Sequence, residues 1–307
     1  MPLDTADETQ LTPSTRDSID GLPSEGEPPT IVSISDIHGY LESVRGALLT
    51  VADHPNFDPI VVRGRDGTLH WADENYVLVF NGDLIDRGPA NEEVLELVAR
   101  LVDEAPPGRV RITLGNHEAI ILSPDHFGFP QWFAGAVDTD DRRLFLEQIV
   151  AGHIVAAYRG HNVTYVHAGS PTGYRVEDVN ESLVDAATKL LEAAGTEEDV
   201  AMQRRVIDDH QRVLGVGKGH PKSPGAGLVW LDFDHLPPDA PPQVVGHTRH
   251  TTPQRKGQVY CQNVLRENLD SDGGEAVFVE TPESLSALTR EADGSVTMTE
   301  LERFSGQ

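Results

Sequence analysis

Five short runs of β-branched and aromatic residues each end in a cluster of glycine with aspartate, histidine, asparagine or arginine. The runs are Ile31–Ser35, Tyr76–Phe80, Val110–Leu114, Val163–Val166 and Gln243–Val245. The clusters are Asp36-Ile37-His38-Gly39, Asn81-Gly82-Asp83-Leu84-Ile85-Asp86-Arg87-Gly88, Gly115-Asn116-His117-Glu118, His167-Ala168-Gly169 and Gly246-His247-Thr248. Because ligand sites of α/β sheets lie at the carboxyl ends of strands, we expect the five clusters to meet at one edge.

The side chains of these clusters are metal-binding types. Imidazole, carboxylate and amide oxygen without a thiolate suit Mn, Fe or Zn rather than a structural zinc site. A carboxylate can bridge two cations about 3.5–4 Å apart, and such a pair can hold a hydroxide and a phosphate together. Taken singly, each cluster has an ordinary explanation, since Asn116 could cap a helix and a lone His167 or His247 could be structural. Together they predict a metal site.

The rest of the chain alternates between strand-like and helical patterns, which is typical of an α/β fold. Helices are expected at Tyr40–Ala52, Asn91–Glu104, Asp140–Val150, Asn180–Ala194 and Glu197–Val213. A further strand is expected at Ala276–Glu280, a hairpin around Asp66-Gly67, and one or two strands within Ser284–Glu302. Residues 1–29 are acidic and poor in apolar side chains, so we expect them to be disordered and a catalytic domain to span residues 30–307.

The charge of the chain restricts its partners. It carries 50 acidic and 24 basic residues, a formal net charge of −26. Such a surface repels nucleic acid and anionic membranes, which excludes both as partners. The acidic residues run the whole length, which favours a protein of a salt-rich cytoplasm over an ordinary acidic protein with an acidic tail. Cys261 is the single cysteine, which excludes a disulfide framework and a thiolate metal cluster. No apolar run is long enough for a membrane span, and the first residues carry no basic start followed by an apolar run, so no secretory signal is expected.

The five clusters together resemble the signature motifs of calcineurin-like metallophosphoesterases. More narrowly, they are similar to the phosphoprotein phosphatase family of serine/threonine phosphatases, over residues 31 to about 280. The stretch Asp66-Gly67 to Trp71, with Asp86-Arg87-Gly88-Pro89, resembles the bacterial and Shewanella-like branch. The resemblance implies a four-layer αββα sandwich of two mixed β-sheets with two divalent ions, Mn²⁺ first and Fe or Zn as alternatives.

The resemblance also implies a role for each residue of the motifs. Asp36 and His38 would bind the first metal, Asp83 would bridge both, and Asn116, His167 and His247 would bind the second. Arg87 and Asn116 would bind phosphate, and His117, oriented by Asp86, would be the general acid. Family members usually have a second arginine before a Leu-Trp strand. Here Lys218 and Lys222 precede Gly225-Ala226-Gly227-Leu228-Val229-Trp230. One of these lysines could replace that arginine and bind phosphate, both could equally be solvated loop residues, and Arg249 is another contender.

The function implied is hydrolysis of phosphoserine or phosphothreonine in proteins, by a hydroxide that bridges the metals. The partner would be a phosphorylated protein or a small phosphoester. One alternative is a dinucleoside polyphosphate hydrolase, a group that tends to lack the aspartate matching Asp86 and to carry Gly-Asn-His-Asp. Asp86 and Glu118 therefore favour the phosphatase. A second alternative is a phosphatase-like scaffold without activity, but no expected ligand is missing.

Overall fold

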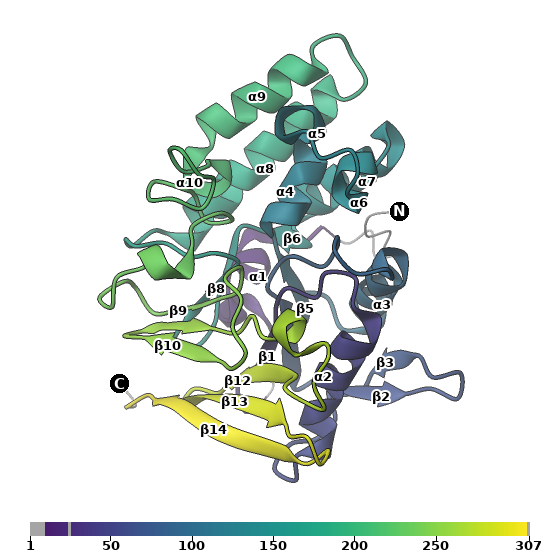
Figure 1. Cartoon of the computed structure of the whole chain (residues 1–307), viewed down its shortest axis with the longest axis vertical. Helices are drawn as coiled ribbons and strands as arrows, with labels where there is room; N and C mark the ends of the chain where they lie inside the picture. The colour runs from purple at the N-terminus through teal and green to yellow at the C-terminus, as the bar shows by residue number, and fades with distance from the viewer. Residues whose placement is uncertain (1–9, 24–25, 306–307) are drawn as a thin grey trace.

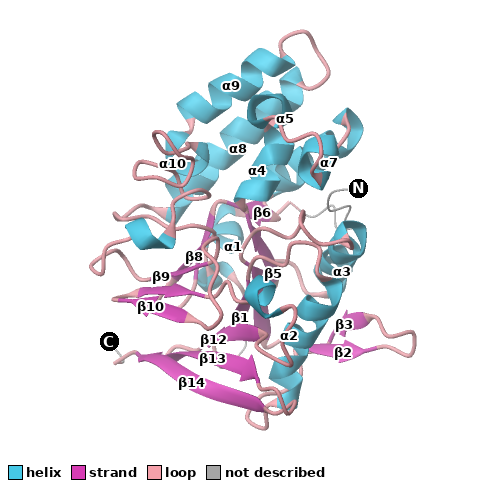
Figure 2. Cartoon of the chain, in the orientation of Figure 1, coloured by secondary structure: helices cyan, strands magenta, loops and turns pink. Residues whose placement is uncertain are grey.

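The computed structural model describes residues 10–23 and 26–305 and contains two mixed β-sheets (Figures 1 and 2). The seven-stranded sheet has the order β14-β13-β12-β1-β4-β5-β6 and the five-stranded sheet the order β10-β11-β9-β8-β7. The larger sheet contains β1 (Thr30–Ile34), β4 (Tyr76–Phe80), β5 (Val110–Thr113), β6 (Ile154–Val155), β12 (Ala276–Glu280), β13 (Ser284–Arg290) and β14 (Val296–Arg303). The smaller contains β7 (Ala157–Arg159), β8 (Thr164–Val166), β9 (Gln243–Val245), β10 (Gln254–Lys256) and β11 (Val259–Cys261).

The directions of the strands determine which strand ends lie side by side. In the larger sheet β1, β4, β5 and β6 are parallel, whereas β12 to β14 are antiparallel. In the smaller sheet β8, β9 and β11 are parallel, with β7 and β10 antiparallel at the two edges. The carboxyl ends of β1, β4 and β5 therefore lie side by side, as do those of β8 and β9.

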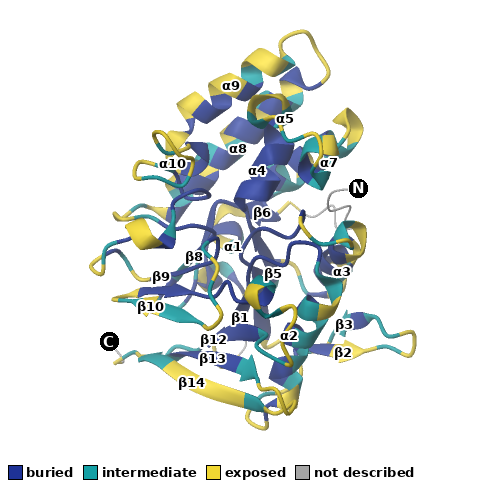
Figure 3. Cartoon of the chain, in the orientation of Figure 1, coloured by how far each residue is buried: buried dark blue, intermediate teal, exposed yellow. Residues whose placement is uncertain are grey.

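The two sheets face each other across an apolar layer. Alternate residues of a strand point to opposite faces, so Ile31, Val77 and Val79 pack with Tyr165 and Val244 of the smaller sheet. Their neighbours Val32, Ile34, Leu78 and Phe80 belong instead to the core that packs under the helices. The expected sandwich of two mixed sheets is confirmed. Figure 3 shows the inner strands as buried, whereas β14 and β10 at the sheet edges are intermediate or exposed.

Helices lie on the outside of this pair of sheets. The longer ones are α2 (Leu41–Asp53), α3 (Asn91–Glu104), α7 (Thr139–Ala151), α8 (Val176–Ala193) and α9 (Asp199–Asp209). The short ones are α1 (Pro13–Asp17), α4 (Asn116–Leu122), α5 (Pro124–Phe127), α6 (Phe133–Ala136), α10 (Gln211–Leu214) and the 3₁₀ turns η1 (Ile19–Gly21), η2 (Phe233–His235) and η3 (Leu265–Asn268). α2 packs on β12 and β13, and α8 packs on β7. None of the helices in the described ranges is both long and apolar enough to cross a membrane.

Most expected elements are present with small differences. The helix Asn91–Glu104 has the predicted bounds, and Asp66-Gly67 joins β2 (Val61–Arg63) to β3 (Leu69–Trp71). The helix expected over 197–213 is interrupted at His210, whose ring hydrogen-bonds Ser182 Oγ at 2.8 Å. The short strands β6, β7, β10 and β11 were not predicted from the sequence.

The expectation of disorder is wrong for residues 10–23. Thr12 caps α1, its side chain accepting from the amide of Thr15, and Arg16 and Asp17 are buried. Asp17 accepts a hydrogen bond from Asn180 at 2.8 Å, and Arg111 donates to the Arg16 carbonyl at 3.2 Å. Composition misses this segment because buried polar groups elsewhere in the chain, as well as apolar contacts, hold it in place. Residues 1–9 and 24–25 of the expected disordered segment lie outside the described residues.

Candidate active site

Asn81 joins the two sheets where their strands end. Its Nδ2 donates to the carbonyls of Val166 in β8 and Val244 in β9, both at 3.2 Å. Its Oδ1 accepts from Thr113 Oγ1 of β5 at 2.7 Å. The carboxyl ends of β4, β5, β8 and β9 are therefore held together by one buried side chain. The sequence does not reveal this role of Asn81, because its partners come from strands far apart in the chain.

The backbone that follows these strands is strained. Among the described residues, the non-glycine residues with a positive φ are Asp36, His38, Asp83, Asp86, Arg87 and His247. All six were expected site residues. A side chain in the left-handed region costs of order 1–3 kcal/mol, so the surrounding structure must hold these turns in place. Strain collected in this way is typical of functional sites.

Two glycines allow the strand ends to approach one another. A Cβ on Gly115 would lie 2.3 Å from the Asp83 amide nitrogen, and one on Gly246 would lie 2.2 Å from Asp36 Oδ2. Both distances are far inside van der Waals contact. A larger residue at either position would push the two clusters apart.

The first group of possible ligands surrounds His38. Its Nε2 lies 3.6 Å from Asp83 Oδ2 and 3.8 Å from Asp36 Oδ1. Its Nδ1 hydrogen-bonds the Ile85 carbonyl at 3.0 Å, which leaves Nε2 with a free lone pair. Asp36 Oδ1 is buried, and no described residue forms a hydrogen bond to it. A backbone carbonyl that orients a ligand imidazole in this way is common at metal sites.

The second group surrounds His167. Its Nε2 lies 3.4 Å from Asp83 Oδ2, 3.3 Å from Asn116 Oδ1 and 3.2 Å from His247 Nδ1. Its Nδ1 hydrogen-bonds the Asn81 carbonyl at 3.0 Å, so Nε2 again faces the shared space. The side chains of all residues expected to bind the second metal therefore meet around His167 Nε2.

Asp83 belongs to both groups, which fits a pair of cations. The ligand atoms of His38, Asp83 and His117 lie within 4.8 Å of one another, as do those of Asp83, His167 and His247. Burial and the neighbouring Asp83 raise the pKa of Asp36 to about 6, although His167 lowers it. Cations at this point would neutralise the negative charge of the neighbouring Asp36 and Asp83 carboxylates. They would also be coordinated by the lone pairs that point there. The nitrogen and oxygen donors present are those that Mn, Fe and Zn accept.

His117 lies at the edge of the first group and pairs with Asp86. Its Nδ1 is 2.5 Å from Asp86 Oδ2, while its Nε2 lies 4.0 Å from Asp83 Oδ2. The other oxygen of Asp86 accepts from the Ala134 amide at 3.1 Å, at the start of α6. The Trp132 ring stacks on the His117 ring, with centroids 4.9 Å apart. The imidazole is therefore fixed in orientation, with Nε2 on the side of the metal ligands.

Glu118 supports the bridging residue. Its carboxylate accepts from the amides of Asp83 and Leu84, both at 2.8 Å, and from that of Gly115 at 3.0 Å. Burial and the Asp83 charge raise the pKa of Glu118 to about 7. In the sequence, Glu118 is recognisable only as part of a motif. No local pattern indicates that its side chain turns back onto the loop after β4.

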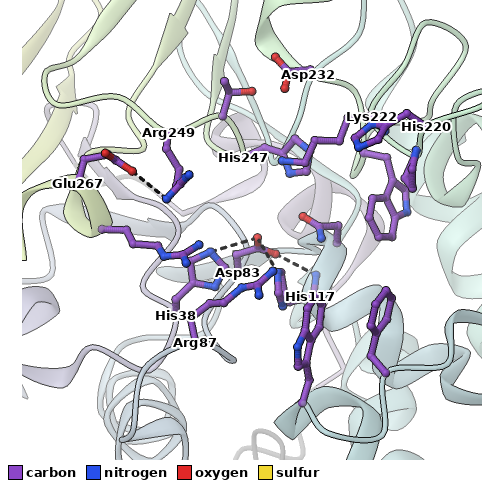
Figure 4. A pocket seen from close by; sticks show the side chains of 17 residues that line it. His38, Asp83, Arg87, His117, His220, Lys222, Asp232, His247, Arg249 and Glu267 are labelled. Atoms are coloured by element: carbon purple, nitrogen blue, oxygen red, sulfur yellow. Dashed lines mark hydrogen bonds and ion pairs between the residues drawn. The ribbon is translucent and has the colours of Figure 1, made fainter.

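A cavity of about 540 Å³ opens over these ligands. Figure 4 shows His38, Arg87 and His117 gathered around Asp83 in it. The Arg87 guanidinium lies 4.1 Å from the centre of the Trp132 ring. The Phe129 ring stacks on the Trp132 ring, with centroids 4.3 Å apart.

The cavity also decides between the expected second cations. Lys222 and Arg249 line it, and Arg249 pairs with Glu267 at 2.9 Å. Lys218 is exposed and lies outside the lining, so the structure does not bring it to the site. Arg266 also lines the cavity and was missed, because its segment carries no motif.

Comparison with known proteins identifies the family. The model of the calcineurin-like phosphoesterase family matches residues 29–208. The chain belongs to the calcineurin-like phosphoesterase family. As a member of this family it is a metal-dependent phosphoesterase, and its ligand geometry fits the dinuclear metal centre that the family uses.

Individual relatives of this phosphoesterase are distant or matched over a short stretch. A symmetrical bis(5'-nucleosyl)-tetraphosphatase of Baumannia cicadellinicola subsp. Homalodisca coagulata is 37% identical over 90 residues, which is 29% of this chain and 23% of that protein. Among solved structures, a cold-active protein-tyrosine phosphatase of a psychrophilic Shewanella species is 17% identical with a TM-score of 0.56, over 96% of this chain and 86% of that one. A further structure of a cold-active protein tyrosine phosphatase is 16% identical with a TM-score of 0.59, over 96% and 84%. These structures share the fold.

Proposed function

We propose that this phosphoesterase removes phosphate from phosphoserine and phosphothreonine in proteins. The observation that carries the proposal is the His117–Asp86 pair at 2.5 Å beside a carboxylate shared by two ligand groups. A serine or threonine alkoxide is a poor leaving group and needs a proton as it departs. An imidazole held at the edge of the metal ligands supplies that proton.

The proposal assigns a task to each residue of the cavity. Arg87 binds phosphate oxygens, for which its planar guanidinium is suited, and Lys222 or Arg249 adds a further positive charge. His117 carries the proton on Nε2, and Asp86 accepts from Nδ1–H and stabilises the protonated ring. Two divalent cations, with Mn²⁺ as first choice and Fe or Zn as alternatives, would bind Asp36, His38, Asp83, Asn116, His167 and His247. When bound, they would lower the pKa of water and neutralise the phosphate charge.

Dinucleoside polyphosphate hydrolysis is the second candidate. The 90-residue similarity to a symmetrical tetraphosphatase supports it. Asp86 and Glu118, present in the structure as hydrogen-bonded residues of the site, favour the protein phosphatase, because the nucleotide hydrolases tend to lack both.

The experiment compares substrates on one preparation. Metal-stripped protein is reloaded with Mn²⁺ in 1 M KCl, and phosphate release is followed from phosphothreonine peptides and from diadenosine tetraphosphate. An Asp83→Asn variant purified in parallel serves as the control for contaminating phosphatases. We expect release from the peptides that is lost in the variant. Cleavage of the nucleotide alone would overturn the proposal, and no turnover with any metal would favour a scaffold.

A further inference from the structure

Arg266 lies in the cavity although it belongs to none of the five clusters. It is the second residue of η3 (Leu265–Asn268), half-buried, between β11 and β12. Leu265 before it and Val264 are buried in the protein, so the backbone of this turn is fixed. The side chain lines the same cavity as Arg87, His38 and His117.

The arginines of the cavity differ in whether an acidic residue pairs with them. Arg249 forms an ion pair with Glu267, seen on one side of Figure 4. Within the described part of the chain, Arg266 has no carboxylate or other hydrogen-bond acceptor on its guanidinium. An arginine side chain carries five N–H donors. The guanidinium of Arg266 therefore has unpaired hydrogen-bond donors in the cavity that contains the expected metal ligands.

Arg266 lines the same cavity as the residues that the proposed function places around the phosphate. Besides burial, its charge is the largest cause that lowers the pKa of Arg87. Two guanidinium groups that repel each other in one cavity are stabilised when a single anion binds both. On a chain with a net charge of −26, such a cluster is unusual and points to an anionic ligand.

We propose that Arg266 binds, together with Arg87, the phosphoryl oxygens of the substrate. This rests on the proposed function only in that the substrate carries a phosphoryl group. A phosphomonoester dianion offers three terminal oxygens and two charges, whereas a diester offers two oxygens and one charge. A second guanidinium therefore selects monoesters over diesters, because its hydrogen bonds to the additional charged oxygen are lost with a diester.

The test measures binding of inorganic phosphate to the Mn²⁺-loaded protein by titration calorimetry, independently of turnover. Arg266→Gln keeps a polar side chain, although a shorter one, and removes the charge and the guanidinium fork, whereas Arg266→Lys keeps the charge alone. Arg303→Gln is the matched control, since Arg303 is exposed, lies outside the cavity and pairs with Glu300. We expect phosphate affinity to fall roughly tenfold or more in Arg266→Gln, the loss of a charged hydrogen-bonded contact, less in Arg266→Lys, and not at all in the control. Metal content should be equal in all four proteins.

The outcomes separate this inference from the proposed function. If wild type and Arg266→Gln bind phosphate equally, Arg266 does not touch the anion, and the inference is wrong while the proposed function stands. The inference also fails if Arg266→Lys matches wild type and the loss in Arg266→Gln disappears in 1 M salt, since the effect would then be a long-range field. A wild-type protein that binds phosphate but hydrolyses no monoester would refute the proposed function alone. A supporting result is a lower ratio of kcat/KM for p-nitrophenyl phosphate to that for its bis ester in Arg266→Gln.

Discussion

His117 presents one ring nitrogen to Asp86 and the other to the metal ligands, so its two possible tasks can be separated. The structure groups its Nε2 with His38 and Asp83 as a possible ligand. The 2.5 Å contact with Asp86 instead favours an acid that is held in orientation. A ligand and an acid respond differently to substitution.

We expect His117→Asn to keep both metals and to lower turnover of alkyl phosphates by roughly 10²–10⁴-fold, the usual contribution of a general acid. Aryl phosphates should lose less, because their leaving groups need less protonation. Phosphate release from a phosphoserine peptide and from p-nitrophenyl phosphate, with metal content by elemental analysis, checks this. Loss of a metal, or equal losses on both substrates, would identify His117 as a ligand instead.

The proposed metal ligands also predict how pH controls metal binding. Burial lowers the pKa of His167, but the carboxylates of Asp83 and Asp36 outweigh it and raise that pKa to about 9. The pKa of Asp36 is raised to about 6. A metal needs both groups deprotonated, so protons compete with it below these values.

Metal affinity should therefore rise with pH, steeply up to about 6 where Asp36 still holds a proton, and further up to about 9 where His167 does. Binding near pH 7.5 should release a proton from His167. Titration of the stripped protein with Mn²⁺ at several pH values, in buffers of different ionisation enthalpy, measures both quantities. An affinity that is constant from pH 6 to 9 would contradict the assignment of His167 as a ligand.

Among the elements, the N-terminal segment packs on the rest of the protein in a way that its composition does not predict. α1 contacts α8 and β7, and Ser18 forms an isolated parallel bridge with Arg159. Leu11, Ile19 and Leu22 are buried. The segment therefore packs along the edge strand β7 of the five-stranded sheet and against α8, and none of residues 10–23 lines the cavity.

Deletion of residues 1–23 should lower the free energy of unfolding by at least about 3 kcal/mol, because each buried aliphatic side chain contributes about 1.5–3 kcal/mol and Arg111 loses a hydrogen-bond acceptor. Metal content should stay at the wild-type value. Urea unfolding followed by circular dichroism checks the change, with deletion of residues 1–9 as the control. An unchanged midpoint for both deletions would show that the segment does not stabilise the fold in solution.

At the scale of the whole molecule, the net charge affects stability. A net charge of −26 on 307 residues produces self-repulsion in the compact state. Salt weakens this repulsion, since the Debye length falls from ~10 Å at 0.1 M to ~3 Å at 1 M. Stability should therefore depend on ionic strength far more than in a protein of balanced charge.

We expect the melting temperature to rise continuously between 0.1 and 2 M KCl. Differential scanning calorimetry measures it, and sucrose solutions of matched osmolality serve as the control for solvent exclusion. A melting temperature that responds equally to sucrose and to KCl would favour an ordinary acidic protein over one adapted to a salt-rich cytoplasm.

The sequence alone determined the strands that carry the site and the residues that could bind metal. Each of these patterns is local: β-branched runs such as Tyr76–Phe80, a helical face over Asn91–Glu104, and polar clusters directly after strands. The tertiary structure decided what depends on residues distant in the chain. It placed Lys222 rather than Lys218 at the cavity, brought Arg266 beside Arg87, and turned Glu118 onto the loop of Asp83. It also ordered residues 10–23 through partners such as Asn180. Side chains that are distant in the chain meet only when the strands and sheets pack, and no local pattern predicts that contact.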